Sequence, residues 1–178
     1  MDFTLTYEGP LAANARPNQK HDIRRELHPQ LKELWEHPPL NQFYWKARPG
    51  SQHLRTVRGH EFVSIVHPDW HFNAELNILM LRPELPRRIV TSGGDIDNRL
   101  KTLFDALARP LHDQDVPAAW TPKDDEKPLH CLLDDDRLIS KVTVETDRLL
   151  AALNSTHVKL VIKVHVHATD IFGGLSLA

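Results

Sequence analysis

The sequence has little of several features that mark specialised classes of protein. Cys131 is the single cysteine, so an internal disulfide cannot form, and a disulfide-stabilised fold is excluded. No apolar run approaches the length of a membrane span. The first residues, Met1 to Thr4, show no basic segment followed by an apolar core, which a secretory signal would have. We therefore expect a cytoplasmic protein that does not cross a membrane.

The chain also lacks the overall positive charge that is common in proteins that bind phosphate-rich partners. Its 22 Lys and Arg residues oppose 24 Asp and Glu residues, giving a formal net charge of −2. This charge is uneven, because residues 1–90 carry +2 and residues 91–178 carry −4. DNA binding requires local rather than total positive charge, so that class remains open. A length of 178 residues and 40% hydrophobic residues suit one domain, which we assign to residues 1–178 with its core over about 60–168.

The most distinctive stretch of the sequence places acids just after a break at Gly93 and Gly94. Two glycines permit a sharp turn into a helix, and Asp95 or Asp97 is suited to cap its first turn. A helix is predicted over 96–108, because its apolar residues form one stripe: Leu100, Leu103, Phe104, Leu107 and Leu111. Polar residues spaced by four form another face: Asp97, Lys101, Asp105 and Arg109.

A second acidic cluster, Asp134-Asp135-Asp136, lies between two apolar segments. Carboxylates from distant parts of a chain suit a hard cation such as Mg²⁺, which prefers oxygen ligands and keeps much of its own water. Each cluster alone has a simpler explanation, since an Asp before a helix is usually a cap and an Asp run is usually a turn. The presence of both clusters together with Lys101 favours a site, but the spacing does not identify a reaction.

Hydrophobic periodicity predicts the remaining elements. A second main helix is expected over 20–37, kinked or split at Pro29. A short helical turn is expected over 147–153, a long acidic loop over 109–131 and a loose tail over 169–178. Strands are predicted over 3–7, 61–66, 72–81, 138–144 and 157–167. These elements indicate an α+β (mixed α/β) domain in which two main helices pack on a mostly antiparallel sheet.

Residues 40–60 are harder to assign but have a distinctive composition. Lys46, Arg48, Arg55 and Arg58 form a basic run without nearby acids, which is typical of a surface that contacts phosphate. We interpret Tyr44 and Trp45 as core residues, with stacking on nucleic-acid bases as the alternative.

The stretch Gly94–Leu107 resembles the Asp-x-Asp-Asn-x-x-Lys…Phe-Asp-Ala-Leu signature of RusA-type Holliday-junction endodeoxyribonucleases. Leu133-Asp134-Asp135, followed by Leu138-Ile139, is similar to the apolar-Leu-Asp-Asp segment and strand of that family, and the Arg82–Arg88 stretch is similar to its lead-in. The similarity covers about residues 72–168. The connection between Leu107 and Leu132 is longer than the family usually has.

The resemblance implies a homodimeric, magnesium-dependent nuclease, with manganese as a substitute ion, that makes paired symmetric nicks in four-way DNA junctions. Its catalytic residues would be Asp95, Asp97, Lys101 and Asp135. The metal ligands would be Asp95, Asp97 and Asp135, with Asp136 as a further candidate. Three consecutive acids permit a one-residue shift, so Asp134 or Asp136 is an alternative third ligand.

Basic residues near the signature are candidate DNA contacts: Arg16, Lys20, Arg82, Arg87 and Arg88. For Arg16 and Lys20, solvated loop charges are the alternative interpretation. Two other functions also fit the sequence. One is a DNA-structure-binding protein without strong catalysis, favoured by the acidic loop and low net charge. The other is a metal-dependent phosphoesterase that acts on other branched or single-stranded DNA.

Overall fold

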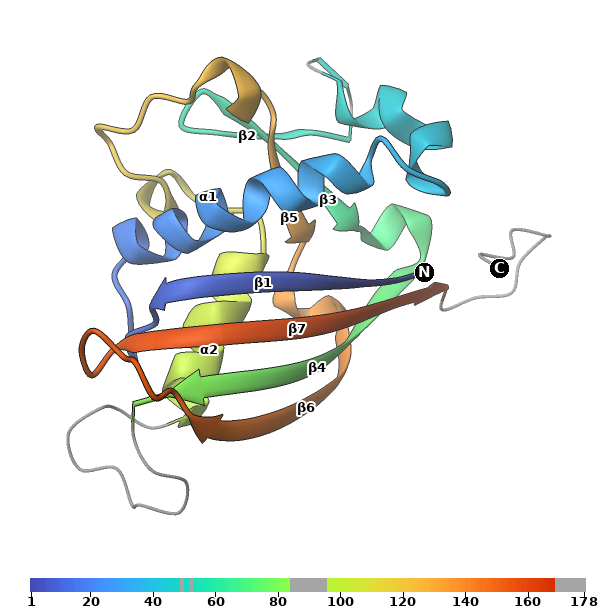
Figure 1. The fold of residues 1–178 in the computed structure, drawn as a ribbon. Helices are drawn as coiled ribbons and strands as arrows, with labels where there is room; N and C mark the ends of the chain where they lie inside the picture. The colour runs from blue at the N-terminus through green and yellow to red at the C-terminus, as the bar shows by residue number, and fades with distance from the viewer. Residues whose placement is uncertain (49, 52, 84–95, 169–178) are drawn as a thin grey trace.

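The computed structural model describes residues 1–48, 50–51, 53–83 and 96–168. The described strands form two sheets (Figure 1). The four-stranded sheet has the order β1 (Asp2–Pro10), β7 (His157–Ala168), β4 (Phe72–Arg82) and β6 (Ile139–Arg148). The three-stranded sheet has the order β2 (Arg55–Val57), β3 (His60–Val66) and β5 (Leu129–Leu133).

Among the described strands, antiparallel pairing is more common than parallel pairing. β7 pairs antiparallel with both β1 and β4, and β2 pairs antiparallel with β3. β4 pairs parallel with β6, and β3 pairs parallel with β5. The sheets are therefore mixed, and the predicted α+β fold is confirmed.

Alternation along β7 determines which face of the large sheet is buried. Val158, Leu160, Ile162, Val164 and Val166 are buried, as the period-2 pattern predicts. The intervening positions are mostly exposed or half-buried, although His157 is 8% exposed and so is also buried. This apolar face, together with the matching faces of β1 and β4, forms the main core.

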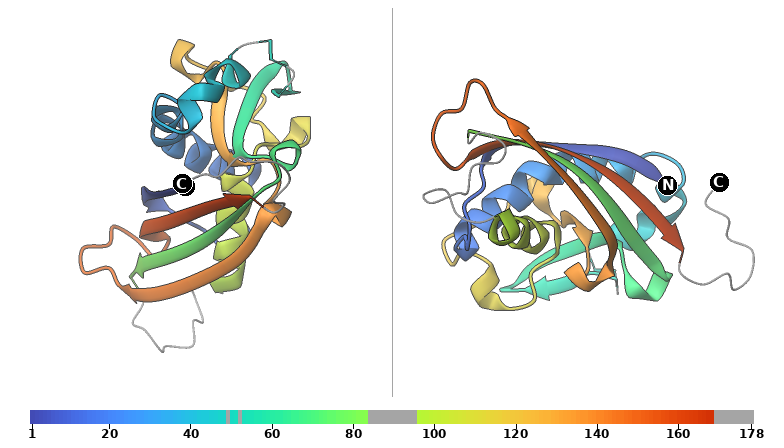
Figure 2. Two further views of the ribbon diagram at one scale, coloured as in Figure 1. Left: turned by 90° about the vertical axis from the view of Figure 1, so that its right-hand side faces the viewer. Right: turned by 90° about the horizontal axis from the view of Figure 1, so that it is seen from below.

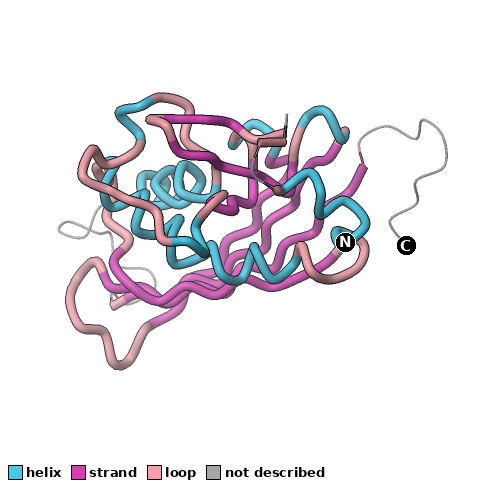
Figure 3. The backbone as a smooth tube through the Cα atoms, turned by 90° about the horizontal axis from the view of Figure 1, so that it is seen from above, coloured by secondary structure: helices cyan, strands magenta, loops and turns pink. Residues whose placement is uncertain are grey.

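Two α-helices cover that apolar face, α1 (Pro17–Leu34) and α2 (Ile96–Leu107). α1 contacts α2, and it also contacts β1 of the large sheet and β5 of the small one. The helices lie between the two groups of strands, as the views from below and above show (Figures 2 and 3). Burial of the helix stripes thus joins the two sheets through a shared core.

α1 begins earlier than predicted and is not split. Pro17 occupies the first turn, where a missing N–H costs nothing. Pro29 lies inside the helix with an exposed side chain, and helical geometry continues to Leu34. The expected split at Pro29 is therefore wrong, because packing of Leu27 and Leu31 into the core keeps the residues on both sides of Pro29 in one helix.

Three other expectations need correction. The predicted loop 109–131 includes most of β5, as well as short 3₁₀ turns at Asp113–Asp115 and Asp124–Glu126. β5 was not recognised because a strand buried on both faces has no alternation. Residues 147–153 form no helical turn, since β6 extends to Arg148 and a turn follows. Leu111 lies beyond α2 and is 52% exposed, so it is not part of the helix stripe.

The segment between α1 and β2 is organised as a longer 3₁₀ helix, η1 (Leu40–Ala47). Tyr44 is half-buried and packs on the main core, as expected, whereas Trp45 is 55% exposed. The core interpretation of Trp45 is therefore wrong. A short 3₁₀ turn, η2 (Pro68–Trp70), follows β3, and another, η5 (Asp136–Leu138), precedes β6. Within the described ranges, no helix is both long and apolar enough to cross a membrane.

Candidate functional site

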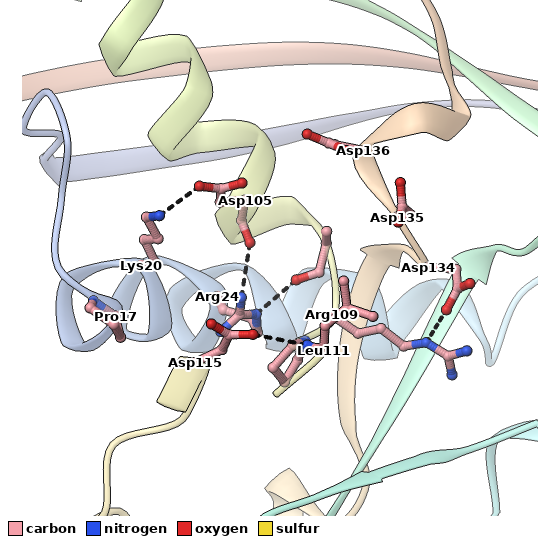
Figure 4. A pocket seen from close by; sticks show the side chains of 12 residues that line it. Pro17, Lys20, Arg24, Asp105, Arg109, Leu111, Asp115, Asp134, Asp135 and Asp136 are labelled. Atoms are coloured by element: carbon pink, nitrogen blue, oxygen red, sulfur yellow. Dashed lines mark hydrogen bonds and ion pairs between the residues drawn. The ribbon is translucent and has the colours of Figure 1, made fainter. Parts of the chain in front are cut away.

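A polar pocket lies where the second acidic cluster meets the two helices (Figure 4). The volume of the pocket is about 170 Å³. It is formed by the first turns of α1, the end of α2, the segment that follows α2, and the turn after β5. Its lining residues are Pro17, Lys20, Arg24, Asp105, Ala108, Arg109, Pro110, Leu111, Asp115, Asp134, Asp135 and Asp136.

Asp134 is the most buried of the three consecutive acids and is held by arginines. Its carboxylate accepts a hydrogen bond from Arg109 Nε and lies 3.0 Å from a terminal nitrogen of Arg55. Its backbone N–H donates to the carbonyl of Val66 at 2.9 Å. Because removal of this carboxylate would leave two cations without their partner, we assign Asp134 to the stability of the strand ends.

Arg109 connects this acid to the chain around it. The guanidinium also contacts His67 Nε2 at 3.0 Å and donates to the carbonyl of His53 at 3.1 Å. Its own backbone N–H donates to the carbonyl of Leu133 at 2.9 Å. Arg109 therefore follows the last turn of α2 into the core rather than continuing the predicted surface row of Asp97, Lys101 and Asp105.

Asp135 is half-buried and is bound to its near neighbour Arg137. The carboxylate accepts from Arg137 Nε at 2.8 Å and from a terminal nitrogen at 3.0 Å, and it also caps η5 by accepting from the backbone N–H of Arg137. These hydrogen bonds lower the pKa of Asp135 to about 2. Arg137 is largely exposed, so water screens much of this ion pair.

Asp136 differs from its neighbours because acids, rather than arginines, dominate its surroundings. Asp136 is exposed, but partial desolvation of its carboxylate raises its pKa, and the negative charges of Asp135 and Asp105 raise it further against the opposing charge of Arg137. Its side chain points toward the side of the pocket formed by α2 (Figure 4). Asp105 itself is bound by Lys20, with 2.6 Å between Nζ and the nearer carboxylate oxygen. Asp136 is thus the acid of the triplet whose charge is least compensated in the described structure.

Arg24, which is 3% exposed, anchors the end of α2 to α1. Its guanidinium donates to the backbone carbonyls of Ala108 and Asp105, each at 2.9 Å. A cation at a helix C-terminus satisfies carbonyls that lack an intrahelical partner. No sequence motif predicts this role for Arg24. A signal was present in its position beside Ile23 on the buried stripe of the helix, where an unpaired arginine would be costly.

The signature residues lie along α2 toward its beginning. Asp97 is in the first turn and exposed, and its carboxylate accepts from the backbone N–H of Asn98 at 2.7 Å. Lys101 is exposed and lies one turn before Asp105 on the same face of the helix. Asp95 lies outside the described residues. Asp136 and Asp105 line the same pocket, whereas Asp97 and Lys101 are not among its lining residues. Asp97 lies two turns before Asp105, or about 12 Å along the axis of α2.

The candidate DNA contacts are in different surroundings. Arg16 is exposed at the start of α1, whereas Lys20 is bound to Asp105 within the pocket. Arg82 is only 7% exposed, which leaves little of its side chain accessible to phosphate. Arg87 and Arg88 lie outside the described residues. Of this set, Arg16 offers the most accessible charge in the described chain.

The fit of a divalent cation depends on these acids. Over the described ranges, no group of three or more His, Cys, Asp and Glu side chains is arranged to hold a metal ion. Mg²⁺ requires fewer protein ligands than that, because it is commonly held by one or two carboxylates, water and substrate phosphate. Desolvation and then repulsion by Asp135 and Asp105 raise the pKa of Asp136, and a cation would relieve the repulsion. In the described structure, Asp136 alone among Asp105 and the three consecutive acids offers a carboxylate without a basic partner closer than its neighbour Arg137, which suits a Mg²⁺ ion that keeps most of its water.

Comparison with known proteins gives no family assignment. No protein-family model matches the sequence, and no curated protein is significantly similar to it.

Proposed function

We propose that this protein is a magnesium-dependent endodeoxyribonuclease that acts on branched DNA, with the four-way junction as its expected substrate. One observation carries the proposal. Asp136 and Asp105 line the same pocket, and Asp105 belongs to the same helix and the same signature as Asp97 and Lys101. Acids separated in the sequence thus converge on a helix whose residues resemble those of the RusA-type family.

A bound Mg²⁺ ion would polarise the scissile phosphate and lower the pKa of a water nucleophile. The chain's own groups would have separate tasks. Asp97 and Asp136 would hold the cation, together with Asp95. Lys101, whose ammonium is exposed one turn along the same helix, would stabilise charge that develops on the phosphate or activate the water. Lys20 would keep Asp105 compensated, and Arg24 would keep the end of α2 in place.

The resemblance also suggests how the cleavage would be paired. A homodimer has a twofold axis, so it would present two identical sites to two symmetric strands of a junction. The family's ligatable products imply that the 3′ oxygen leaves the phosphorus.

A binding protein without strong catalysis is the second candidate function. Asp134 and Asp135 already have arginine partners, which leaves Asp136 as the less compensated acid of the triplet. A protein of this kind would bind branched DNA equally well with and without a divalent ion. A metal-dependent phosphoesterase with another DNA substrate is the third candidate, and it would differ in substrate preference alone.

A cleavage panel separates the three functions. The full chain is incubated with a four-way junction, a flap, a duplex and a single strand, each with Mg²⁺, Mn²⁺ or EDTA. We expect paired nicks in the junction with Mg²⁺ and no cleavage with EDTA. Asp125→Asn serves as a matched control, because Asp125 is an exposed acid outside the pocket. Junction binding without cleavage under any metal would support the binding protein, and preferred cleavage of another substrate would support the phosphoesterase.

A further inference from the structure

Aromatic and cationic side chains gather on a surface that the proposed nuclease site does not use. We call it the Trp45 surface; it includes η1, the residues after it and η2, and consists of Phe43, Tyr44, Trp45, Lys46, Arg48, His53 and Trp70. η1 is the cyan helical segment at the upper right of Figure 1. Trp45 is 55% exposed, in contrast to the fully buried Trp35. A single exposed aromatic residue is ordinary, but one that joins several neighbouring rings forms a patch of the kind that binds partners or ligands.

Lys46 is fixed at the centre of this surface by aromatic rings. Its Nζ lies 4.8 Å from the ring centre of Trp70, 5.3 Å from that of Phe43 and 5.4 Å from that of Trp45. Arg48 lies over the ring of Tyr44 at 5.7 Å. These distances are in the range of cation–π attraction, so the cations are oriented by the rings rather than by carboxylates.

The charge of the surface is positive although the chain as a whole is negative. Of the predicted basic run, Lys46 and Arg48 supply this charge. Arg55 and Arg58 do not, because Arg55 is bound to Asp134 at 3.0 Å and Arg58 donates to the backbone carbonyl of Asp113 at 2.9 Å. In the described part of the chain, no carboxylate lies within salt-bridge distance of Lys46 or Arg48. Asp69 is the acid whose charge acts on Lys46, where it opposes the pKa-lowering effect of burial. Lys46 and Arg48 are therefore available to an anionic partner.

We propose that the Trp45 surface binds single-stranded nucleic acid, with an unpaired base stacked on Trp45 and the adjoining phosphate held by Lys46 and Arg48. An exposed aromatic ring beside cations is the combination by which proteins bind unpaired strands, because every base has a face for stacking and every nucleotide has a phosphate. A basic peptide or a purely apolar partner would gain nothing from the two cations. A duplex would keep its bases paired and away from the ring.

The surface is joined directly to the candidate site. Arg109, which holds Asp134 in the pocket, donates to the backbone carbonyl of His53, and the His53 ring lies 5.8 Å from that of Trp45. If the proposed nuclease function holds, this surface would position an unpaired DNA strand beside the pocket. Strand binding itself does not depend on that function, because it involves neither Asp97 nor Lys101.

Binding is measured with the full chain by the fluorescence anisotropy of a labelled oligothymidylate of about 12 nucleotides, in EDTA and at about 50 mM salt. We expect Trp45→Ala to weaken binding about tenfold and Trp45→Phe, which keeps a ring, to retain most of it. Leu150→Ala is the matched control, since Leu150 is a highly exposed apolar residue on a distant turn. Circular dichroism verifies that each variant is folded. An unchanged affinity for Trp45→Ala would overturn the proposal.

A second comparison tests whether bases are bound rather than charge alone. The same length of abasic deoxyribose-phosphate should bind at least fivefold more weakly than the oligothymidylate, because it has nothing to stack on Trp45. Arg48→Gln should reduce the slope of log affinity against log salt concentration by about the amount expected for one phosphate contact. Equal binding of the abasic strand would assign the surface to polyanions in general and overturn base stacking. Cleavage of junctions by a Trp45→Ala variant that still binds the oligothymidylate would leave the nuclease function standing and this inference rejected.

Discussion

The carboxylates of Asp136 and Asp105 face the same pocket, and the pKa of Asp136 is raised by partial desolvation and then by the charges of Asp135 and Asp105. Lys20 compensates Asp105 at 2.6 Å, while Asp136 keeps an acidic environment. Two acids held near each other in this way repel, and folding must overcome that repulsion. A cation bound beside Asp136 would relieve the repulsion that Lys20 leaves, which is why we connect the arrangement to metal-dependent chemistry.

Replacement of Asp97 by Asn should abolish cleavage of a four-way junction while the fold and DNA binding remain. The substitution keeps the shape of the side chain and removes one negative charge that would hold the metal. DNA binding should be unchanged or slightly tighter, because less negative charge then faces phosphate. Cleavage, gel-shift and circular dichroism assays are run together, with Asp125→Asn as control. Asp95→Asn is expected to behave in the same way, and full cleavage by either variant would reject the metal-site assignment.

The three consecutive acids should give three different results. Asp134→Asn leaves Arg109 and Arg55 without their carboxylate, so we expect a loss of about 3 kcal/mol in the free energy of unfolding. Asp136→Asn should keep stability and lose Mg²⁺-dependent cleavage. Asp135→Asn should have a smaller effect on cleavage, although the sequence resemblance assigns the third ligand to this position.

Urea denaturation and single-turnover cleavage at several Mg²⁺ concentrations measure these effects. A dead Asp135→Asn variant beside an active Asp136→Asn variant would return the third ligand to Asp135. Wild-type stability of Asp134→Asn would show that the arginine contacts of Asp134 contribute little.

Replacement of Lys101 by Arg distinguishes a catalytic ammonium from a surface charge. If Lys101 were only part of a row of charges along α2, Arg would be accepted with a change of a few tenths of a kcal/mol. A catalytic ammonium is a compact donor that a planar guanidinium does not reproduce. We expect normal folding and junction binding. The single-turnover rate should fall at least about a hundredfold, which corresponds to an increase of roughly 2.7 kcal/mol in the activation free energy. A loss below about threefold would place Lys101 outside the chemistry.

Acid should destabilise the fold through buried histidines. Burial lowers the pKa of both His21 and His130 to about 3, and His28 is shifted in the same direction. In the unfolded chain these rings bind a proton near pH 6.5, so the unfolded state takes up protons first as pH falls. These histidines therefore leave the free energy of unfolding almost unchanged well above pH 6.5, and they lower it progressively between pH 6.5 and 3. For His130, we expect a loss of about 2 kcal/mol between pH 7 and pH 5.

Denaturant titrations at pH 7 and pH 5 measure this loss. His130→Phe keeps a ring of similar size against Trp35 and should reduce the difference between the two pH values. His37→Gln, at an exposed histidine on the surface, is the control and should leave the difference unchanged. An equal pH dependence in His130→Phe and the unmodified protein would assign the acid sensitivity to other groups.

Much of the fold could be predicted because local patterns report burial directly. The alternation of Val158, Leu160 and Ile162 gave β7, and the stripe of Ile23, Leu27 and Leu31 gave α1. β5 could not be recognised in this way, since all five of its residues are buried and its pairing with β3 is parallel. The exposure of Trp45 could not be predicted either, because an aromatic residue in a short segment has the same sequence signal in a core and on a surface.

The candidate site shows the same division between sequence and structure. The sequence by itself determined the chemistry of its parts: acids at 97 and 134–136, a lysine at 101, and a helix to hold some of them. Only the tertiary structure decided how the three consecutive acids divide their roles, with Asp134 bound to Arg109, Asp135 to Arg137, and Asp136 near Asp105. The physical reason is that a carboxylate's role depends on the charges within a few ångströms of it. Those neighbours come from α1, α2 and the end of β5, which the sequence separates and the packed core brings together.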